Sequence, residues 1–492
     1  MQWSRYNRLF RKGHGGGFLY NAQSNTLFEL DEVYYTLLEG WRDCRTIPVT
    51  GDEAFLCLLR EKTVVVEPGE EDRFLLACQY QRQAACFDSS RLGLTICPTL
   101  RCNFRCPYCF EQGQLNGAMM TQKTMDRLVD FIKSYKNIRH LSVAWYGGEP
   151  LLAFDTICTL TRQFRNLGLT YEKAGLVTNG YLLDDEKINK LHDLDIASIQ
   201  ITIDGPREVH DTRRVLANGG PTFDRILNNI TALFDSDYTG CCSIRVNVDR
   251  HNLKNYSDLR TALLERYKGK NLAVYPGHVH TSQSHPYGQV CTLDSGEWTD
   301  FTFDLFQREG VIPTGGFYPG HNPNPICAAT THHGFVVGAE GELYKCWEDV
   351  GKQGMVIGNI NLDEPVNNPV LRAQYTIGTN PFCDPECLAC DVLPICGGGC
   401  PNKRLMAKQF QEKGLEYCSP YKNHLIDYLE AYYNTFRAKE ICAAITSPGK
   451  EKAIDKGYRN ISPVPEKTLR TAQPGGTSFG SGMIEYVVSN GQ

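Results

Sequence analysis

From Leu92 onward the sequence alternates short apolar runs with longer amphipathic stretches, and this alternation restricts the fold more than any other feature. Repeated units of this kind predict parallel strands joined by helices that cover the sheet. The predicted strands are Leu92–Thr99, His140–Tyr146, Ala174–Thr178, Ser198–Ile203, Ser243–Asp249 and Leu272–Tyr275. The predicted helices are Thr121–Tyr135, Phe154–Asn166, Asp184–Leu194, Thr222–Phe234, Tyr256–Tyr267 and Gly296–Arg308. We therefore expect an α/β fold, a six-stranded partial TIM-like barrel whose active face lies at the carboxyl ends of its strands.

Length and charge exclude several classes of protein. A chain of 492 residues is long enough for about two to four domains. Its net charge of -5 provides no basic surface for nucleic acid, and no apolar run is long enough to span a bilayer. The first residues lack the apolar core of a signal peptide. Because 21 cysteines without an export signal indicate a reducing compartment and metal clusters, we expect a cytoplasmic protein.

Four segments differ in pattern along the chain. Residues 1–88 predict a small α+β module, with a hairpin at 18–30 and helices beginning at Asp31 and Asp52. Residues 89–310 hold the predicted barrel, and cysteines dominate residues 311–442. Residues 443–492 are rich in Pro, Gly, Ser and charged residues, which predicts a flexible tail. The short apolar run Met483–Val488 within that tail is a candidate docking segment.

Cys102, Cys106 and Cys109 follow the first predicted strand with the spacing C-x₃-C-x₂-C. Three thiolates this close can bind three irons of a cubane cluster and leave the fourth iron open to another ligand. A structural zinc site is the alternative, but it requires a fourth ligand, and no Cys or His follows closely. Cys97 lies in an apolar run, where a buried thiol is the simpler interpretation.

Polar residues mark the carboxyl ends of the next strands. They are Gly147-Gly148-Glu149-Pro150, Thr178-Asn179-Gly180 and Asp204-Gly205-Pro206, with Arg214 shortly behind. Glycines permit close approach to the backbone, and a carboxylate accepts hydrogen bonds from an ammonium group. Each motif alone is also compatible with an ordinary turn. Together, at successive strand ends, they predict a ligand site on the barrel face.

The cysteine loop and these strand ends resemble the radical S-adenosylmethionine (SAM) enzymes. The resemblance implies a [4Fe–4S] cluster on Cys102, Cys106 and Cys109, with SAM at its open iron. It also implies that the Gly147–Pro150 motif, through Glu149, meets the amino group of SAM, and that Asn179, Asp204 and Arg214 lie near its ribose or carboxylate. In this family the reduced cluster cleaves SAM to a 5′-deoxyadenosyl radical, which abstracts hydrogen from unactivated carbon.

A second cysteine block resembles the SPASM extension, which carries two auxiliary [4Fe–4S] clusters. The resemblance implies that Cys387, Cys390, Cys396 and Cys418 bind one cluster, and that Cys327, Cys346 and Cys400 bind the other. The second set lacks one ligand of the family pattern, and Cys291 and Cys383 are candidates at unexpected spacing. Without it, an iron would stay open to a substrate thiolate. Zinc-ribbon-like sites are the alternative for these paired cysteines.

Proteins of this layout resemble maturases of ribosomally made peptides, which form thioether or carbon crosslinks in a precursor peptide. The N-terminal module resembles winged-helix-like elements that bind the leader of such a precursor; a purely structural cap is the alternative. A flavodoxin or ferredoxin would donate electrons. The competing hypothesis is an anaerobic sulfatase-maturating enzyme, which makes formylglycine and carries an aspartate where this chain has Trp347, while Glu348 and Asp349 are out of register. A non-catalytic iron–sulfur carrier or peptide-binding scaffold is a third hypothesis, which the SAM motifs disfavour.

Overall fold

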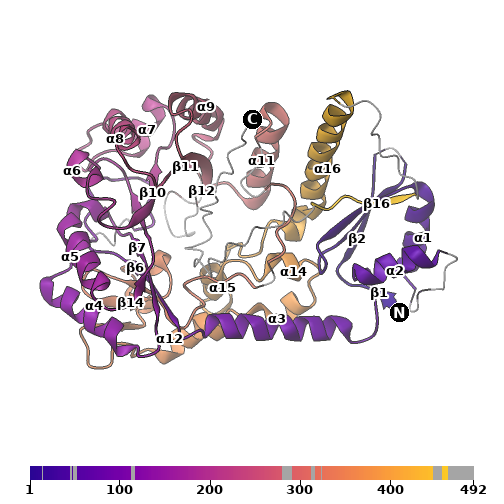
Figure 1. The fold of residues 1–492 in the computed structure, drawn as a ribbon, viewed down its shortest axis with the longest axis horizontal. Helices are drawn as coiled ribbons and strands as arrows, with labels where there is room; N and C mark the ends of the chain where they lie inside the picture. Colours follow the sequence, from indigo (N-terminus) through magenta and orange to yellow (C-terminus); the bar gives the residue numbers. More distant parts are fainter. Residues whose placement is uncertain are drawn as a thin grey trace.

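The computed structural model describes residues 1–446 and 457–463, apart from 14, 45–46, 48–51, 112, 114–116, 280–286, 288–290, 312–315 and 323. Strands of the barrel and their helices lie on one side of the molecule, and the N-terminal module lies on the other (Figure 1). None of the helices in these described ranges is long and apolar enough to cross a membrane.

The six predicted barrel strands lie side by side in one sheet. They are β6 (Arg91–Ile96), β7 (His140–Trp145), β9 (Ala174–Thr178), β10 (Ile196–Thr202), β11 (Cys241–Val248) and β12 (Leu272–His278). Their order is β12-β11-β10-β9-β7-β6, and all these pairs are parallel. The short strand β8 (Thr170–Tyr171) pairs with β7. The expected α/β fold is therefore confirmed.

Helices cover the outer face of this sheet (Figure 1). They include α4 (Gln122–Ser134), α5 (Phe154–Arg165), α7 (Arg207–Arg213), α8 (Phe223–Asp235), α9 (Tyr256–Arg266) and α11 (Ser295–Glu309), with 3₁₀ turns η1 (Pro150–Ala153) and η2 (Leu253–Asn255). The helix predicted over 184–194 is shorter, because α6 (Asp185–Ile188) gives way to turns that end at Asp195, whose φ is 53°. That left-handed residue ends the helical stretch directly before β10.

The cysteine-rich region continues the barrel sheet, which the sequence did not predict. β13 (Gly334–Val337) pairs in parallel with β6, and β14 (Glu342–Tyr344) and β15 (Gly358–Asn359) extend the edge antiparallel. Short helices and turns follow, namely η3 (Trp347–Asp349), η4 (Gln353–Met355), α12 (Pro369–Ala373), η5 (Gln374–Gly378), η6 (Pro381–Cys383), α13 (Pro385–Leu388), α14 (Leu393–Cys396) and α15 (Pro401–Lys408). The long helix α16 (Tyr421–Thr446) comes after them.

The N-terminal module contains a meander of β2 (Asn7–Arg11), β3 (Gly17–Asn21) and β4 (Thr26–Leu30). α1 (Glu32–Arg42) and α2 (Glu53–Glu61) are capped by the side chains of Asp31 and Asp52, as the sequence predicts. β1 (Gln2–Trp3) pairs with β5 (Val65–Val66). The long helix α3 (Glu70–Cys86), which we did not predict, runs from this module toward the barrel (Figure 1).

The expectation of a flexible tail is wrong for one segment. Strand β16 (Tyr458–Asn460) pairs antiparallel with β4 and joins the N-terminal sheet. The apolar run Met483–Val488 lies outside the described residues. The division of the chain at 88/89, 310/311 and 442/443 stays a prediction.

Candidate active site

The three predicted cluster cysteines lie on the loop that follows β6, at the carboxyl end of the parallel strands. Cys106 is buried, and Cys102 and Cys109 are partly exposed. A turn brings the Cys109 amide to the Cys106 carbonyl at 3.2 Å, and the Phe104 amide donates to the Cys102 sulfur at 3.4 Å. The loop therefore presents three thiols together at the strand ends.

The thiol chemistry fits a bound iron–sulfur cluster. Burial raises the pKa of Cys102 and of Cys109 to about 12, and it raises the pKa of Cys106 as well. Each thiol also lies within electrostatic range of another of the three. Because burial disfavours the negatively charged thiolate, these cysteines need a neighbouring positive charge to ionise, and bound iron would supply it. Among the described residues, no three His, Cys, Asp or Glu side chains are close enough to hold one metal ion, so the three thiols share the loop without converging on a single point.

Gly147 and Gly148 lie directly against this loop. A Cβ on Gly147, whose φ is +110°, would lie 2.6 Å from the Thr99 carbonyl oxygen, and one on Gly148 would lie 2.4 Å from that of Arg101. The Gly148 amide also donates to Thr99 at 3.2 Å. The loop backbone is therefore the close neighbour that requires glycine at these two positions, and their role in binding SAM stays a prediction. Any side chain here would displace the cysteine loop.

Glu149 is completely buried and holds two strand ends together. Its Oε1 accepts hydrogen bonds from the Leu151 amide at 3.0 Å and the Thr178 hydroxyl at 2.7 Å. Its Oε2 accepts one from the Asn179 amide at 2.8 Å. Burial raises the pKa of Glu149, and these hydrogen bonds oppose the shift. A carboxylate has about four acceptor positions, so one stays available for the predicted ammonium group.

Tyr108, between two cluster cysteines, connects the loop to the other predicted residues. Its hydroxyl donates to Asp204 and accepts from Arg214 at 2.8 Å and from Asn247 at 3.2 Å. Both Asp204 and Arg214 are buried, and the Arg214 Nε has no hydrogen-bond partner among the described residues. The Asn179 amide group reaches Asn103 of the loop at 2.8 Å. The structure therefore brings the predicted residues Glu149, Asn179, Asp204 and Arg214 to one loop, and their SAM-binding roles stay predictions.

Sequence reasoning missed a second polar layer behind this network. Arg213 donates to both carboxylate oxygens of Asp249, at 3.0 and 2.8 Å, and to the Tyr287 hydroxyl at 2.9 Å. Asn247 lies two residues before Asp249, after the partly exposed Arg245. The alternation of buried apolar and partly exposed polar residues in β11 was the available signal, because such alternation predicts a strand with one polar face.

The thiols predicted for auxiliary clusters also gather in two groups. Burial raises the pKa of Cys346, and the neighbouring Cys327 and Cys400 thiols add to it. Burial likewise raises the pKa of Cys418, with Cys396 and Cys387 nearby, and that of Cys390, beside Cys396. Arg404 donates to the Cys387 sulfur at 2.9 Å. These groups match the two predicted ligand sets, whose clusters stay predictions.

The two candidates for the missing auxiliary ligand lie elsewhere. Cys291 contacts His251 at 3.0 Å, on the barrel side. Cys383 is exposed and lies 3.5 Å from the Asn380 amide group. In the described part of the chain, neither of these contacts involves Cys327, Cys346 or Cys400. The structure therefore does not support either as the fourth ligand.

Glu348 and Asp349 have different surroundings. Asp349 is fully buried, receives a hydrogen bond from Asn402 at 2.9 Å and another from the Tyr375 hydroxyl. Burial raises its pKa to about 6. Burial also raises the pKa of Glu348. It raises the pKa of Glu111 in the cysteine loop to about 7, and the nearby Glu348 carboxyl adds to that shift. Asp349 is therefore held by hydrogen bonds inside the fold, and both carboxyls lie close enough to Cys346 to raise the pKa of its thiol.

We expect Asp349→Ala to destabilise the chain by about 2–3 kcal/mol, because it leaves two buried polar partners without their acceptor. The midpoint of urea unfolding should fall relative to the wild type. Asp363→Ala, at an exposed position, is the control and should leave the midpoint unchanged. Equal midpoints for both variants would contradict a structural role for Asp349.

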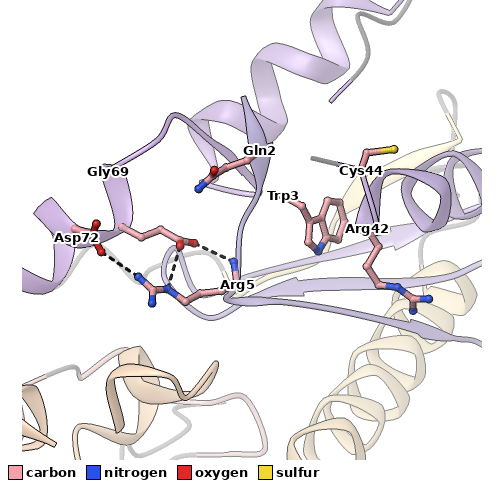
Figure 2. A pocket seen from close by; sticks show the side chains of 8 residues that line it. Gln2, Trp3, Arg5, Arg42, Cys44, Gly69 and Asp72 are labelled. Atoms are coloured by element: carbon pink, nitrogen blue, oxygen red, sulfur yellow. Dashed lines mark hydrogen bonds and ion pairs between the residues drawn. The ribbon is translucent and has the colours of Figure 1, made fainter. Parts of the chain in front are cut away.

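A pocket of about 540 Å³ lies in the N-terminal module, away from the cysteines (Figure 2). Arg5 at its rim is already paired with Glu71 at 3.0 Å and with Asp72 at 3.4 Å. Trp3, Arg42 and Cys44 line the other side (Figure 2). None of the predicted cluster or SAM residues lines this pocket.

Comparison with known proteins matches this geometry. The model of the Radical SAM superfamily matches residues 96–261, which include the cysteine loop and the polar strand ends. The chain contains a radical SAM domain. This domain is the one found in radical SAM enzymes, which use SAM and a [4Fe–4S] cluster. The predicted resemblance is confirmed.

The radical SAM domain is shared with curated relatives that match most of the chain. The serine-type anaerobic sulfatase-maturating enzyme of Bacteroides thetaiotaomicron is 24% identical over 398 residues, which are 73% of this chain and 94% of that protein. The cysteine-type enzyme of Clostridium perfringens (strain 13 / Type A) is 22% identical over 352 residues, 65% and 91%. The solved structure of native anSMEcpe with bound AdoMet has a TM-score of 0.53 at 21% identity, over 70% of this chain and 98% of that one. This last likeness shows the fold alone.

Proposed function

We propose that this radical SAM enzyme modifies a residue of a peptide, as a maturase of a ribosomally made precursor that forms a thioether or carbon crosslink. The observation that carries the proposal is a further group of thiols, Cys327, Cys346 and Cys400, next to Glu348, whose carboxyl acts on Glu111 of the cysteine loop. A cluster there could accept electrons from an oxidised substrate. When bound, SAM and the clusters supply one-electron chemistry that removes hydrogen from unactivated carbon. A flavodoxin or ferredoxin would supply the electron.

The inner wall of the barrel offers groups that would hold the peptide. In β11 the partly exposed Arg245 and Asn247 alternate with buried apolar residues, and Arg245 Nε donates to Asn247 at 2.8 Å. On the neighbouring strands, the Tyr275 hydroxyl donates to Gln200 at 2.6 Å. These side chains would orient the peptide near Tyr108, which Asn247 contacts. In such chemistry the protein contributes by holding the substrate in position relative to the reactive atom of the cofactor.

Formylglycine formation is the second candidate function, and the curated relatives favour it. Those relatives are sulfatase-maturating enzymes, whereas in this chain Trp347 follows Cys346 and stacks on Tyr146, with ring centroids 5.6 Å apart. An indole cannot accept a proton from a substrate thiol or hydroxyl. This departure favours the peptide maturase, with the N-terminal module as the part that would bind a leader.

The test is an anaerobic assay of the reconstituted full chain with SAM, dithionite and synthetic peptides that contain cysteine or serine. A crosslinking maturase should release 5′-deoxyadenosine and produce a peptide that has lost a pair of hydrogen atoms and carries no aldehyde, because formylglycine made from serine also lacks two hydrogen atoms but reacts as an aldehyde. Replacement of the thiol by an aldehyde oxygen, with release of hydrogen sulfide, would instead establish formylglycine formation. Bound metal without 5′-deoxyadenosine would overturn both candidates.

The auxiliary thiols give a further prediction. We expect Cys346→Ala/Cys400→Ala to lose about four irons per chain and to abolish peptide product, while SAM cleavage continues, because the SAM loop is intact. Iron analysis, 5′-deoxyadenosine and product mass would be measured together. Cys241→Ala/Cys158→Ala, at partly exposed cysteines outside both groups, is the matched control and should retain all three. Unchanged iron in the first variant would contradict an auxiliary cluster there.

A further inference from the structure

The C-terminal segment lies on the N-terminal sheet as an added strand. β16 pairs antiparallel with β4, with Tyr458 opposite Leu30 and Asn460 opposite Phe28. Backbone hydrogen bonds extend the pairing at both ends, from Asp31 to the Gly457 carbonyl at 2.8 Å and from Ile461 to the Leu27 carbonyl at 2.9 Å. The segment reaches this edge from the far end of the chain, beside α16 (Figure 1). The sheet edge thus holds an extended peptide.

The first side chain of the strand packs against two aromatic rings. The ring centroid of Tyr458 lies 4.4 Å from that of Phe55 and 5.0 Å from that of Tyr34. The Tyr34 hydroxyl is fixed by Asp52 at 2.7 Å. Gly457 enters beside these rings with φ +74°, where a Cβ would lie 2.4 Å from the Asp31 carboxylate. An aromatic residue preceded by glycine therefore fits this end of the edge.

A buried carboxylate receives the second side chain. Glu29 is 2% exposed and accepts from Arg459 through Nε at 2.7 Å. It also accepts from Lys12 at 2.7 Å and from the Tyr433 hydroxyl at 2.6 Å. Because Lys12 remains beside it, Glu29 keeps a cationic partner if Arg459 leaves. Glu29 therefore favours a basic residue directly after the aromatic one. When no peptide is bound there, Lys12 still pairs with the buried Glu29 charge.

An apolar position follows at the other end. The Ile461 side chain is 2% exposed. The Ile461 carbonyl accepts a hydrogen bond from the Tyr432 hydroxyl at 2.6 Å, and the Leu27 amide donates one to the Ser462 hydroxyl oxygen at 2.8 Å. The side chains that meet the sheet are thus aromatic, basic and aliphatic, in that order. Main-chain pairing along an edge is independent of sequence, so this pattern supplies the selectivity.

The rest of the sheet stands without the added strand. β2, β3 and β4 are consecutive antiparallel strands joined by short turns, and their core includes Leu19, Phe28 and Leu38 of the same module. Only three residues of β16 are in strand conformation, and ten residues separate Gly457 from the end of α16. The added strand is therefore the part of the sheet that costs least to replace.

We propose that the outer edge of β4 is a peptide-docking site, which the chain's own segment 457–462 occupies and from which an extended peptide with an aromatic, a basic and an aliphatic residue in the same register displaces it. The identification of that peptide with part of the substrate rests on the proposed function; the docking itself does not. The segment then acts as an internal competitor that sets the affinity for the incoming peptide.

The test uses a fluorescein-labelled peptide of residues 455–463 as the probe, without SAM or iron. A chain that ends at Lys456 should bind it saturably, by fluorescence anisotropy, and the full chain should bind it about tenfold or more weakly, because the tethered segment competes at high effective concentration. A probe with Tyr458→Ala and Arg459→Gln should bind the shortened chain far more weakly than the wild-type probe.

A full-length Tyr458→Ala/Arg459→Gln variant is the control for misfolding of the shortened chain. It keeps the full length of the chain and only weakens the pairing of the internal strand. It should gain binding of the wild-type probe, with an unchanged circular dichroism spectrum. Absence of probe binding to this folded variant would overturn the proposal, as would equal binding of both probes. Since the assay needs no turnover, its failure is distinct from a failure to cleave SAM.

Discussion

The variant Cys102→Ala/Cys106→Ala/Cys109→Ala is expected to release no 5′-deoxyadenosine above background, a loss of about 10⁶-fold or more, which is the lower range of enzymatic rate enhancements. The three thiols lie together on the loop after β6, at the carboxyl ends of the parallel strands. Without them no cysteine of the loop is left to bind iron. Iron content should fall by about four per chain.

The measurement is 5′-deoxyadenosine by chromatography under dithionite, together with iron analysis of the same samples. Cys97→Ala/Cys242→Ala is the matched control, because both thiols are fully buried and each lies in or directly after a barrel strand. The control should lose stability but keep iron and SAM cleavage in its folded fraction. Full SAM cleavage by the triple variant would contradict the assignment of these cysteines.

Glu149→Ala is expected to weaken SAM binding by about two orders of magnitude, because removing one partner of a buried, hydrogen-bonded charge pair costs about 2–5 kcal/mol. It should also destabilise the fold by about 3 kcal/mol or more, since three buried donors lose their acceptor. Those donors are the amides of Leu151 and Asn179 and the hydroxyl of Thr178. Equilibrium dialysis of SAM and urea unfolding measure the two effects separately.

Glu172→Ala is the matched control for Glu149. Glu172 is partly exposed, pairs with Arg91 at 2.6 Å and lies near the amino end of the strands, away from the cysteine loop. It should leave SAM affinity unchanged. Glu149→Gln separates the two roles, because it keeps the shape and the Oε1 acceptor but removes the negative charge. Wild-type SAM affinity in a folded Glu149→Gln variant would mean that Glu149 only joins the strand ends.

The barrel could be predicted from local sequence because its strands are largely apolar and each presents a buried face. All six expected strands appear within a few residues of their predicted bounds, from Leu92–Thr99, observed as Arg91–Ile96, to Leu272–Tyr275, observed as Leu272–His278. A parallel strand that is buried on both faces has a nearly continuous run of apolar residues, so a short window of sequence is enough to recognise it. The cysteine spacing is equally local.

Contacts between distant segments could not be predicted. β13 continues the barrel sheet next to β6, about 240 residues earlier in the chain, and nothing in either short strand specifies the other. Glu111 and Glu348 belong to the cysteine loop and to the turn after Cys346, and only the packed structure brings them together. The compositional prediction of a flexible tail missed β16, since edge pairing depends on the partner strand.

The sequence by itself therefore determined the α/β class, the cysteine loop, the polar strand ends and the ligand types available for chemistry, because these depend on residue identity and short-range periodicity. Only the tertiary structure decided that Gly147 and Gly148 make room for the loop, that Asp349 is held by Tyr375 and Asn402, and that the C-terminal segment occupies the edge of β4. Such outcomes depend on which surfaces meet when distant parts of the chain pack, and packing is a property of the whole fold.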